Sequence, residues 1–356
     1  MRMRWLCLFA ISAGSSGPAM TQLPAMPDIP RVAPPERPED RHFRVVIPNR
    51  PAPTPIILHV SPQGSDDGDG SARKPFASLV RAQQAVRSLN RDHDVTVSLA
   101  AGTYRLNAPL RFGAGDGGQN GYTVRWEGAP GTRAILSGGQ PVTGWRQVDK
   151  QRNIWAASVP AGTDPRQLIV ARELAPRASV EIPRTAVAFH PWGLEIKDAA
   201  WRFLAQLPGQ SRIEVEGMSW FTHRHAMVDR IEGDRIVMQQ PGWRNNLVGY
   251  DTMARPVSAE VARLFLVNAL AFLREPGQWF VDPKAGQLYY KPRPGENMSR
   301  IDIVLPRLEH LLSIAGSYDE PVRDLEFRRL QFSHTSWLQP SGPEGYASQQ
   351  SGAYLA

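Results

Sequence analysis

The stretch EPGQWFVDPKAGQLYYKPRP, residues 275–294, has the pattern of a tight β-hairpin. Residues 279–282 and 287–291 are rich in the aromatic and β-branched side chains that favour strands. Between them, Pro283 favours a φ near about −65°, and Gly286 can adopt the positive φ that a tight turn needs. The stretch therefore predicts two antiparallel strands joined by a short turn.

Other short strand patterns lie on both sides of this hairpin. They are bounded by turn residues and cover 56–60, 95–99, 101–106, 122–126, 134–139 and 301–305. Residues 80–89 instead have apolar side chains at three- and four-residue steps, which predicts an amphipathic helix with Ser78 as its N-cap. A second short helix is expected within 261–274, leading into the hairpin.

Three stretches of the chain resemble proteins built on a right-handed parallel β-helix of the pectate-lyase-like kind. They are the hairpin, residues 60–85 with their SPQGSD and PFASL segments, and PVRDLEFRRLQFSHTSW at 321–337. The hairpin and the 321–337 stretch together resemble the glycoside hydrolase family that has α-L-fucosidase and xylanase members. This resemblance implies an exported, carbohydrate-active protein.

The pattern and the resemblance together predict an all-β fold, a right-handed parallel β-helix interrupted by an inserted β-rich domain. In such proteins the early helix covers the open edge of the first coil. The predicted organisation is a signal peptide at 1–20, a Pro-rich linker at 21–55, a capping helix with first coils at 56–145, an inserted β-rich domain ending in the hairpin at 146–300, and resumed coils at 301–356.

The length of the resumed coils is short for a solenoid, which needs about three or more stacked repeats and a terminal cap. We therefore expect the chain to be the N-terminal part of a longer protein. A glycosidase needs two positioned carboxylates, and related proteins would carry them on later coils. No Asp or Glu pair stands out as catalytic, so the catalytic residues stay unknown.

The N-terminus has the order of a secretory signal peptide: a basic head at 1–4, an apolar run at 5–13 and small residues at 15–19. The run is shorter than the about 20 residues that span a bilayer. The single cysteine, Cys7, lies inside it, so cleavage would leave a chain without disulfides. We expect export to the periplasm or the exterior; a disordered N-terminus of a cytoplasmic protein is the alternative.

The charge balance leaves several partners open. The formal net charge is +7 from 41 basic and 34 acidic residues, without a block of like charges that would form a nucleic-acid stripe. A basic balance permits an acidic glycan as partner without requiring one. The expected partner is a polysaccharide or oligosaccharide, with no nucleic acid and no membrane span.

The candidate substrate-binding residues lie in two polar stretches, WFTHRH at 220–225 and QQPGWRNN at 239–246. Trp rings can stack on sugars, although core packing is the alternative role for each. Asn side chains offer donors and acceptors for hydroxyl groups. The six candidates are Trp220, His223, His225, Trp243, Asn245 and Asn246.

His223 and His225 are separated by one residue, so on a strand they face the same way. Such a pair could bind a metal, contact a sugar hydroxyl, or be ordinary hydrogen-bonded histidines. A metal needs a third ligand, and no Cys, Asp or Glu stands nearby in an ordinary ligand motif. The aspartates at 66–69 lack the closing glutamate of an EF-hand and are read as turn residues. We expect neither a metal nor another cofactor.

The sequence-based functional hypothesis is a glycoside hydrolase acting on polysaccharide by two-carboxylate acid/base catalysis. One alternative is a non-catalytic glycan-binding or surface structural protein. A second is a polysaccharide lyase, which would need a calcium site of clustered aspartates and an Arg or Lys base.

Overall fold

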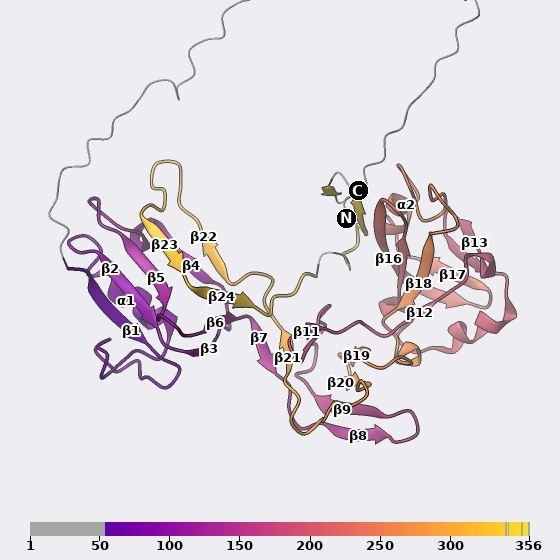
Figure 1. The fold of residues 1–356 in the computed structure, drawn as a ribbon. Helices are drawn as coiled ribbons and strands as arrows, with labels where there is room; N and C mark the ends of the chain where they lie inside the picture. The colour runs from indigo at the N-terminus through magenta and orange to yellow at the C-terminus, as the bar shows by residue number, and fades with distance from the viewer. Residues whose placement is uncertain (1–53, 339, 341, 350–351, 355–356) are drawn as a thin grey trace, which may run out of the picture. The chain divides into compact units, whose positions relative to one another are not determined.

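The computed structural model describes residues 54–338, 340, 342–349 and 352–354 (Figure 1). The predicted signal peptide and all of the predicted linker except residues 54 and 55 lie outside the described residues. Among the helices in the described part of the chain, none has the length and apolarity needed to cross a bilayer.

A parallel sheet forms the first part of the described chain. Its strands, in spatial order, are β1 (Ile56–Val60), β2 (Val95–Leu99), β5 (Val124–Gly128) and β23 (Leu325–Arg328). Helix α1 (Leu79–Arg87) contacts β1 (Figure 1). Its N-cap is Ser78, as predicted, and the Ser78 side chain accepts a hydrogen bond from the Arg81 backbone N–H at 3.1 Å. Nearby, the Asp66 carboxylate accepts backbone N–H bonds from Ala77 and Ser78, which agrees with a structural role for this aspartate.

In two smaller parallel sheets, strands from residues 102–137 pair with strands from residues 312–333. In the first, β6 (Ala134–Ser137) lies between β24 (Leu330–Ser333) and β3 (Gly102–Arg105). In the second, β22 (Leu312–Ile314) pairs with β4 (Leu110–Phe112).

The predicted hairpin is confirmed. Strands β19 (Trp279–Asp282) and β20 (Gln287–Tyr290) pair antiparallel, and Gly286 in the turn has a φ of 60°. The sheet continues through β9 (Ile154–Ser158) to β8 (Arg146–Asp149). A further antiparallel sheet has the order β11 (Glu173–Leu174), β10 (Ile169–Val170), β21 (Ile303–Pro306) and β7 (Gly139–Pro141).

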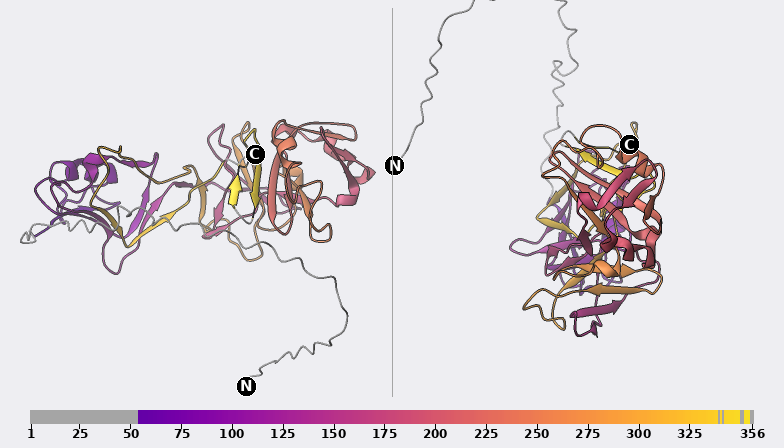
Figure 2. Two further views of the ribbon diagram at one scale, coloured as in Figure 1. Left: turned by 90° about the horizontal axis from the view of Figure 1, so that it is seen from above. Right: turned by 90° about the vertical axis from the view of Figure 1, so that its right-hand side faces the viewer.

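The largest sheet contains nine strands and is antiparallel in every described pairing. Its main order is β12 (Ser179–Glu181), β18 (Arg263–Val267), β15 (Glu214–Met218), β16 (Thr222–Glu232), β17 (Arg235–Met238), β14 (Gly193–Ile196) and β13 (Val187–His190). Strand β25 (Tyr346–Gln349) pairs with β16 and with β26 (Gly352–Tyr354). In Figure 2 the yellow C-terminal strand lies beside the salmon strands of this sheet.

The remaining described helices are short. Helix α2 spans Gly242–Asn246, and 3₁₀ helices span η2 (Ala114–Asp116), η3 (Arg184–Ala186), η4 (Ala199–Gln206), η5 (Gln210–Arg212) and η6 (Leu270–Phe272). The helix expected within 261–274 is present only as the short 3₁₀ helix η6, whereas residues 263–267 form strand β18, which pairs with β12 and β15 on its two sides. Alternating Leu264 and Leu266 pack into the core from this strand, which is a period of two rather than a helical period.

The predicted right-handed parallel β-helix is wrong, whereas the all-β class is confirmed. Parallel pairing is confined to small sheets of two to four strands, and the other described sheets are antiparallel. The predicted coils at 301–356 themselves contain antiparallel strands, because β21 pairs antiparallel with β7 and β10, and β25 pairs antiparallel with β16. Strand patterns of similar length and spacing fit either arrangement.

The apolar core consists of three clusters. One lies between α1 and the parallel sheets and includes Phe76, Trp126 and Leu136. A second surrounds Trp279 and Tyr290 of the hairpin. The third packs against one face of the nine-stranded sheet. That third cluster leaves the opposite face of the sheet free to carry polar side chains.

Candidate functional site

The polar face of the nine-stranded sheet carries the candidate site. Strand side chains alternate between faces, and Val215, Ala226 and Leu266 form one cross-strand row that points into the core. The neighbouring row on the other face contains Glu216 and His225, which are paired directly across β15 and β16. Glu214 lies on the same face because it is two residues from Glu216 on β15. His223 lies on this face because it is two residues from His225 on β16.

Glu214 is a buried anion held by two arginines. Its side chain is 1% exposed, Arg166 Nη1 donates to both carboxylate oxygens at 2.7 and 2.6 Å, and Arg177 Nη1 donates to Oε1 at 2.8 Å. Burial opposes ionisation of Glu214, but Arg177, His225 and Arg166 outweigh it and hold the pKa well below its usual value. Glu214 is therefore an ionised structural group and a poor proton donor.

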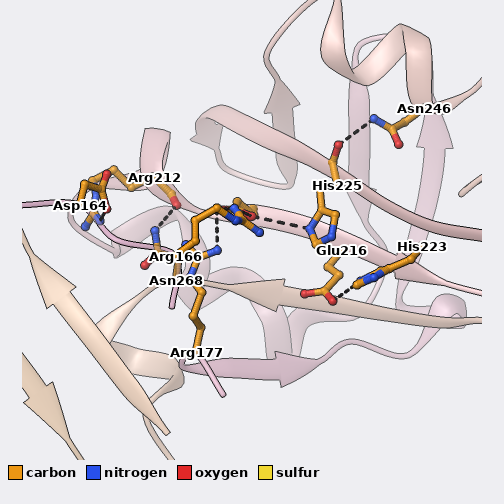
Figure 3. Close-up of polar contacts among 10 residues, drawn as sticks. Asp164, Arg166, Arg177, Arg212, Glu216, His223, His225, Asn246 and Asn268 are labelled. Atoms are coloured by element: carbon orange, nitrogen blue, oxygen red, sulfur yellow. Dashed lines mark hydrogen bonds and ion pairs between the residues drawn. The ribbon is translucent and has the colours of Figure 1, made fainter. Parts of the chain in front are cut away.

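Glu216, His223 and His225 converge beside this anion (Figure 3). A carboxylate oxygen of Glu216 contacts His223 Nε2, and the two imidazole ring centroids are 4.4 Å apart. His225 is buried, with Nδ1 3.7 Å from Glu214 Oε2, whereas the side chains of Glu216 and His223 are 21% and 41% exposed. The group thus extends from a buried ion cluster to solvent.

Two predicted residues donate to backbone oxygen atoms. Asn246 is buried and donates from Nδ2 to the backbone oxygens of His225 and Gly242, each at 2.8 Å (Figure 3). Asn245 donates to the Glu344 backbone oxygen at 3.0 Å. Both amides therefore connect helix α2 to neighbouring backbone segments.

The two predicted tryptophans lie in opposite environments. Trp243 has 0% exposure, stacks with Phe189 at 6.1 Å and donates from Nε1 to the His190 backbone oxygen at 2.8 Å. The Trp243 ring has no exposed face on which a sugar could stack, and it packs in the core. Trp220 is 65% exposed in the turn between β15 and β16.

Trp220 belongs to a group of aromatic side chains at this turn. Its ring centroid lies 6.3 Å from that of Phe221, which lies 6.1 Å from that of Tyr250, another exposed residue. The buried Asp251 fixes the arrangement, since its carboxylate accepts bonds from Ser219 Oγ, the Phe221 N–H, Thr222 Oγ1 and the Val257 N–H. The aromatic group is therefore presented on an anchored turn.

A shallow pocket of about 630 Å³ lies on the same part of the chain, beside α2. Its lining residues are Pro191, Trp192, Gln240, Pro241, Arg244 and Leu247. The Trp192 ring stacks with His190 at 4.7 Å, and Arg235 lies 4.3 Å from its centroid. The predicted 239–246 stretch thus contributes to this pocket through Gln240, Pro241 and Arg244 rather than through Trp243.

Sequence reasoning missed the acidic and basic members of the site, Glu214, Glu216, Arg166 and Arg177. Residues 213–218, IEVEGM, alternate apolar and acidic side chains, which is the pattern of a strand with one charged face. That signal predicts that Glu214 and Glu216 share a face. It does not predict their partners, because Arg166 and Arg177 are far along the chain.

Comparisons with known proteins give one substantial structural likeness. No family model and no curated protein matches the chain. A solved structure described as a glycoside hydrolase superposes with a TM-score of 0.69 and 25% sequence identity, covering 83% of this chain and 53% of that one. The chain thus spans about half the length of that structure.

Two further solved structures match less well. One, described as the complex structure of XylC with xylose, has a TM-score of 0.36 and 13% identity over 79% of this chain and 35% of that one. A rhamnogalacturonan lyase has a TM-score of 0.20 and 26% identity over 23% of this chain and 22% of that one. Neither superposes closely enough to bear on the fold or the function.

Proposed function

We propose that this chain belongs to an exported carbohydrate-active protein that hydrolyses glycosidic bonds in polysaccharides. The observation that carries the proposal is the structural likeness to a glycoside hydrolase over 83% of the chain. Export is supported by the basic head and apolar run at the N-terminus. Because the likeness covers 53% of the other chain, the reaction itself is part of the proposal.

The chemistry of hydrolysis requires one carboxyl group that protonates the leaving oxygen and another that acts as nucleophile or base. Glu214 does not fit the acid role, because two arginines keep it ionised and its side chain is buried. Glu216 is more accessible, but its carboxylate contacts His223. We therefore assign neither as catalytic.

A test of hydrolysis is the release of reducing ends by the full chain. The substrates are xylan, a fucose-containing polysaccharide and pectin, with starch for comparison. The proposal predicts that at least one of them releases reducing ends. The products should not absorb in the ultraviolet, because such absorption would indicate cleavage by a lyase. If no substrate released reducing ends and none bound to the chain, this result would contradict a carbohydrate-active function.

Glycan binding without hydrolysis is a second candidate function. The specific observation is the anchored aromatic group of Trp220, Phe221 and Tyr250, since flat aromatic faces stack on pyranose rings. Binding without release of reducing ends would favour this candidate.

The variant Trp220→Ala tests the role of the aromatic group. Loss of an exposed stacking face should weaken polysaccharide binding by at least about fivefold, which corresponds to about 1 kcal/mol. Affinity electrophoresis in gels that contain the polysaccharide measures the change. The matched control is Trp192→Ala, which alters a tryptophan of the separate shallow pocket. Equal retention of wild type and Trp220→Ala would exclude the turn as the binding surface.

A further inference from the structure

The side chains of Glu216, His223 and His225 bring three metal-binding atoms together. One ligand atom from each residue lies within 4.8 Å of the others. The β15–β16 register causes this convergence, because Glu216 is directly opposite His225 and His223 lies on the same face. A tetrahedral zinc site, with bonds of about 2.0–2.1 Å, places its ligand atoms about 3.3 Å apart. The side chains of Glu216 and His223 are partly exposed, which leaves them room to rotate towards that spacing.

The surroundings of His225 have the form of an outer coordination shell. Its buried Nδ1 has no hydrogen-bond partner within the described residues, and it faces Glu214 Oε2 at 3.7 Å. A proton on Nδ1 would be attracted to that carboxylate and leave Nε2 as the lone-pair atom. Glu214 is in turn held by Arg166 and Arg177. A carboxylate behind a histidine fixes the tautomer and increases the basicity of the ligand nitrogen.

We propose that Glu216, His223 and His225 form a zinc-binding site on the polar face of the nine-stranded sheet. Two imidazoles and one carboxylate favour zinc over magnesium or calcium, which prefer all-oxygen ligands. Three protein ligands would leave one position for water or a substrate oxygen, and the partial exposure of His223 and Glu216 keeps the group open to solvent. The sequence-based expectation of no metal rested on a missing third ligand, and the strand register supplies it in Glu216.

The test is isothermal titration calorimetry, in which the metal-free full chain is titrated with Zn²⁺ at pH 7.5. The proposal predicts one Zn²⁺ per chain with micromolar or tighter affinity. The variants His223→Ala and Glu216→Gln should each weaken that affinity by more than about 100-fold, because loss of an outer-shell partner alone costs about 10- to 100-fold. Substitution with Co²⁺ should give visible absorption bands of a nitrogen- and oxygen-ligated ion, which the variants lose.

A matched control is His190→Ala. His190 Nε2 lies 3.0 Å from Glu195 Oε2 in a comparably exposed His–Glu pair, but this pair has no third ligand within the described residues. His190→Ala should therefore bind Zn²⁺ like the wild type. Circular dichroism and urea unfolding of His223→Ala and Glu216→Gln verify that both variants are folded. Wild-type binding weaker than about 100 μM, or equal affinity in the wild type and these two variants, would overturn the proposal.

Discussion

Glu214→Gln is expected to lower the free energy of unfolding by about 3–5 kcal/mol, because it removes the negative charge that faces two buried arginines. Arg166 and Arg177 have side chains that are 10% and 12% exposed, and both donate to the Glu214 carboxylate. Glutamine preserves the shape but leaves two desolvated positive charges next to each other. Urea unfolding at pH 7 measures the loss.

The matched control is Glu216→Gln on the same strand and the same face. Its partner is a single, partly exposed histidine, so in the absence of added metal the change should cost less than about 1 kcal/mol. A Glu214→Gln variant that unfolds within 1 kcal/mol of the wild type would show that the buried ion cluster does not stabilise the sheet.

The same pair of proteins gives a pH dependence of defined sign. The pKa of Glu214 in the folded chain lies below its usual value of 4.5. The stabilisation from this carboxylate is therefore complete above that value and is lost as the pH falls through the folded-state pKa. The stability difference between wild type and Glu214→Gln should shrink on acidification from pH 7 to pH 3.

Trp243→Ala is expected to have the second large effect, a loss of about 3–5 kcal/mol in the free energy of unfolding. The ring has no exposed surface, and its indole N–H donates to a backbone oxygen in the core. Truncation would create a cavity beneath strand β13 and leave that oxygen without its donor. Thermal or urea unfolding measures the change.

Trp220→Ala serves as the comparison for Trp243→Ala. Trp220 is exposed, so its loss should change stability by less than about 0.5 kcal/mol while weakening glycan binding. The reverse outcome, in which Trp243→Ala is as stable as the wild type but binds no glycan, would return Trp243 to the sugar-contact role that its sequence context allowed.

Local signals in the sequence were sufficient for the elements whose contacts are local. The 275–294 hairpin was predictable because Pro283 and Gly286 determine its turn, and α1 was predictable from its apolar steps and Ser78. Strand positions such as 56–60 and 95–99 were likewise predictable from their apolar pattern.

Pairing between distant segments was not predictable in the same way. Short apolar runs fit parallel coils and antiparallel sheets equally well, and this ambiguity produced the wrong β-helix. The candidate site depends on one such pairing, since Glu216 reaches His225 only through the β15–β16 register. Trp220 and Trp243 had similar sequence contexts, yet one lies in a turn and the other in the core.

The central claim is that the chain binds carbohydrate at the aromatic turn and the adjoining polar face. Hydrogen–deuterium exchange of the full chain, with and without an oligosaccharide from the polysaccharide that it binds best, tests this claim most directly. The account predicts slower exchange at residues 218–225 and 247–252, around the aromatic turn and the adjoining polar face. Protection confined to the parallel sheets at 56–137, or no change anywhere at saturating ligand, would contradict it.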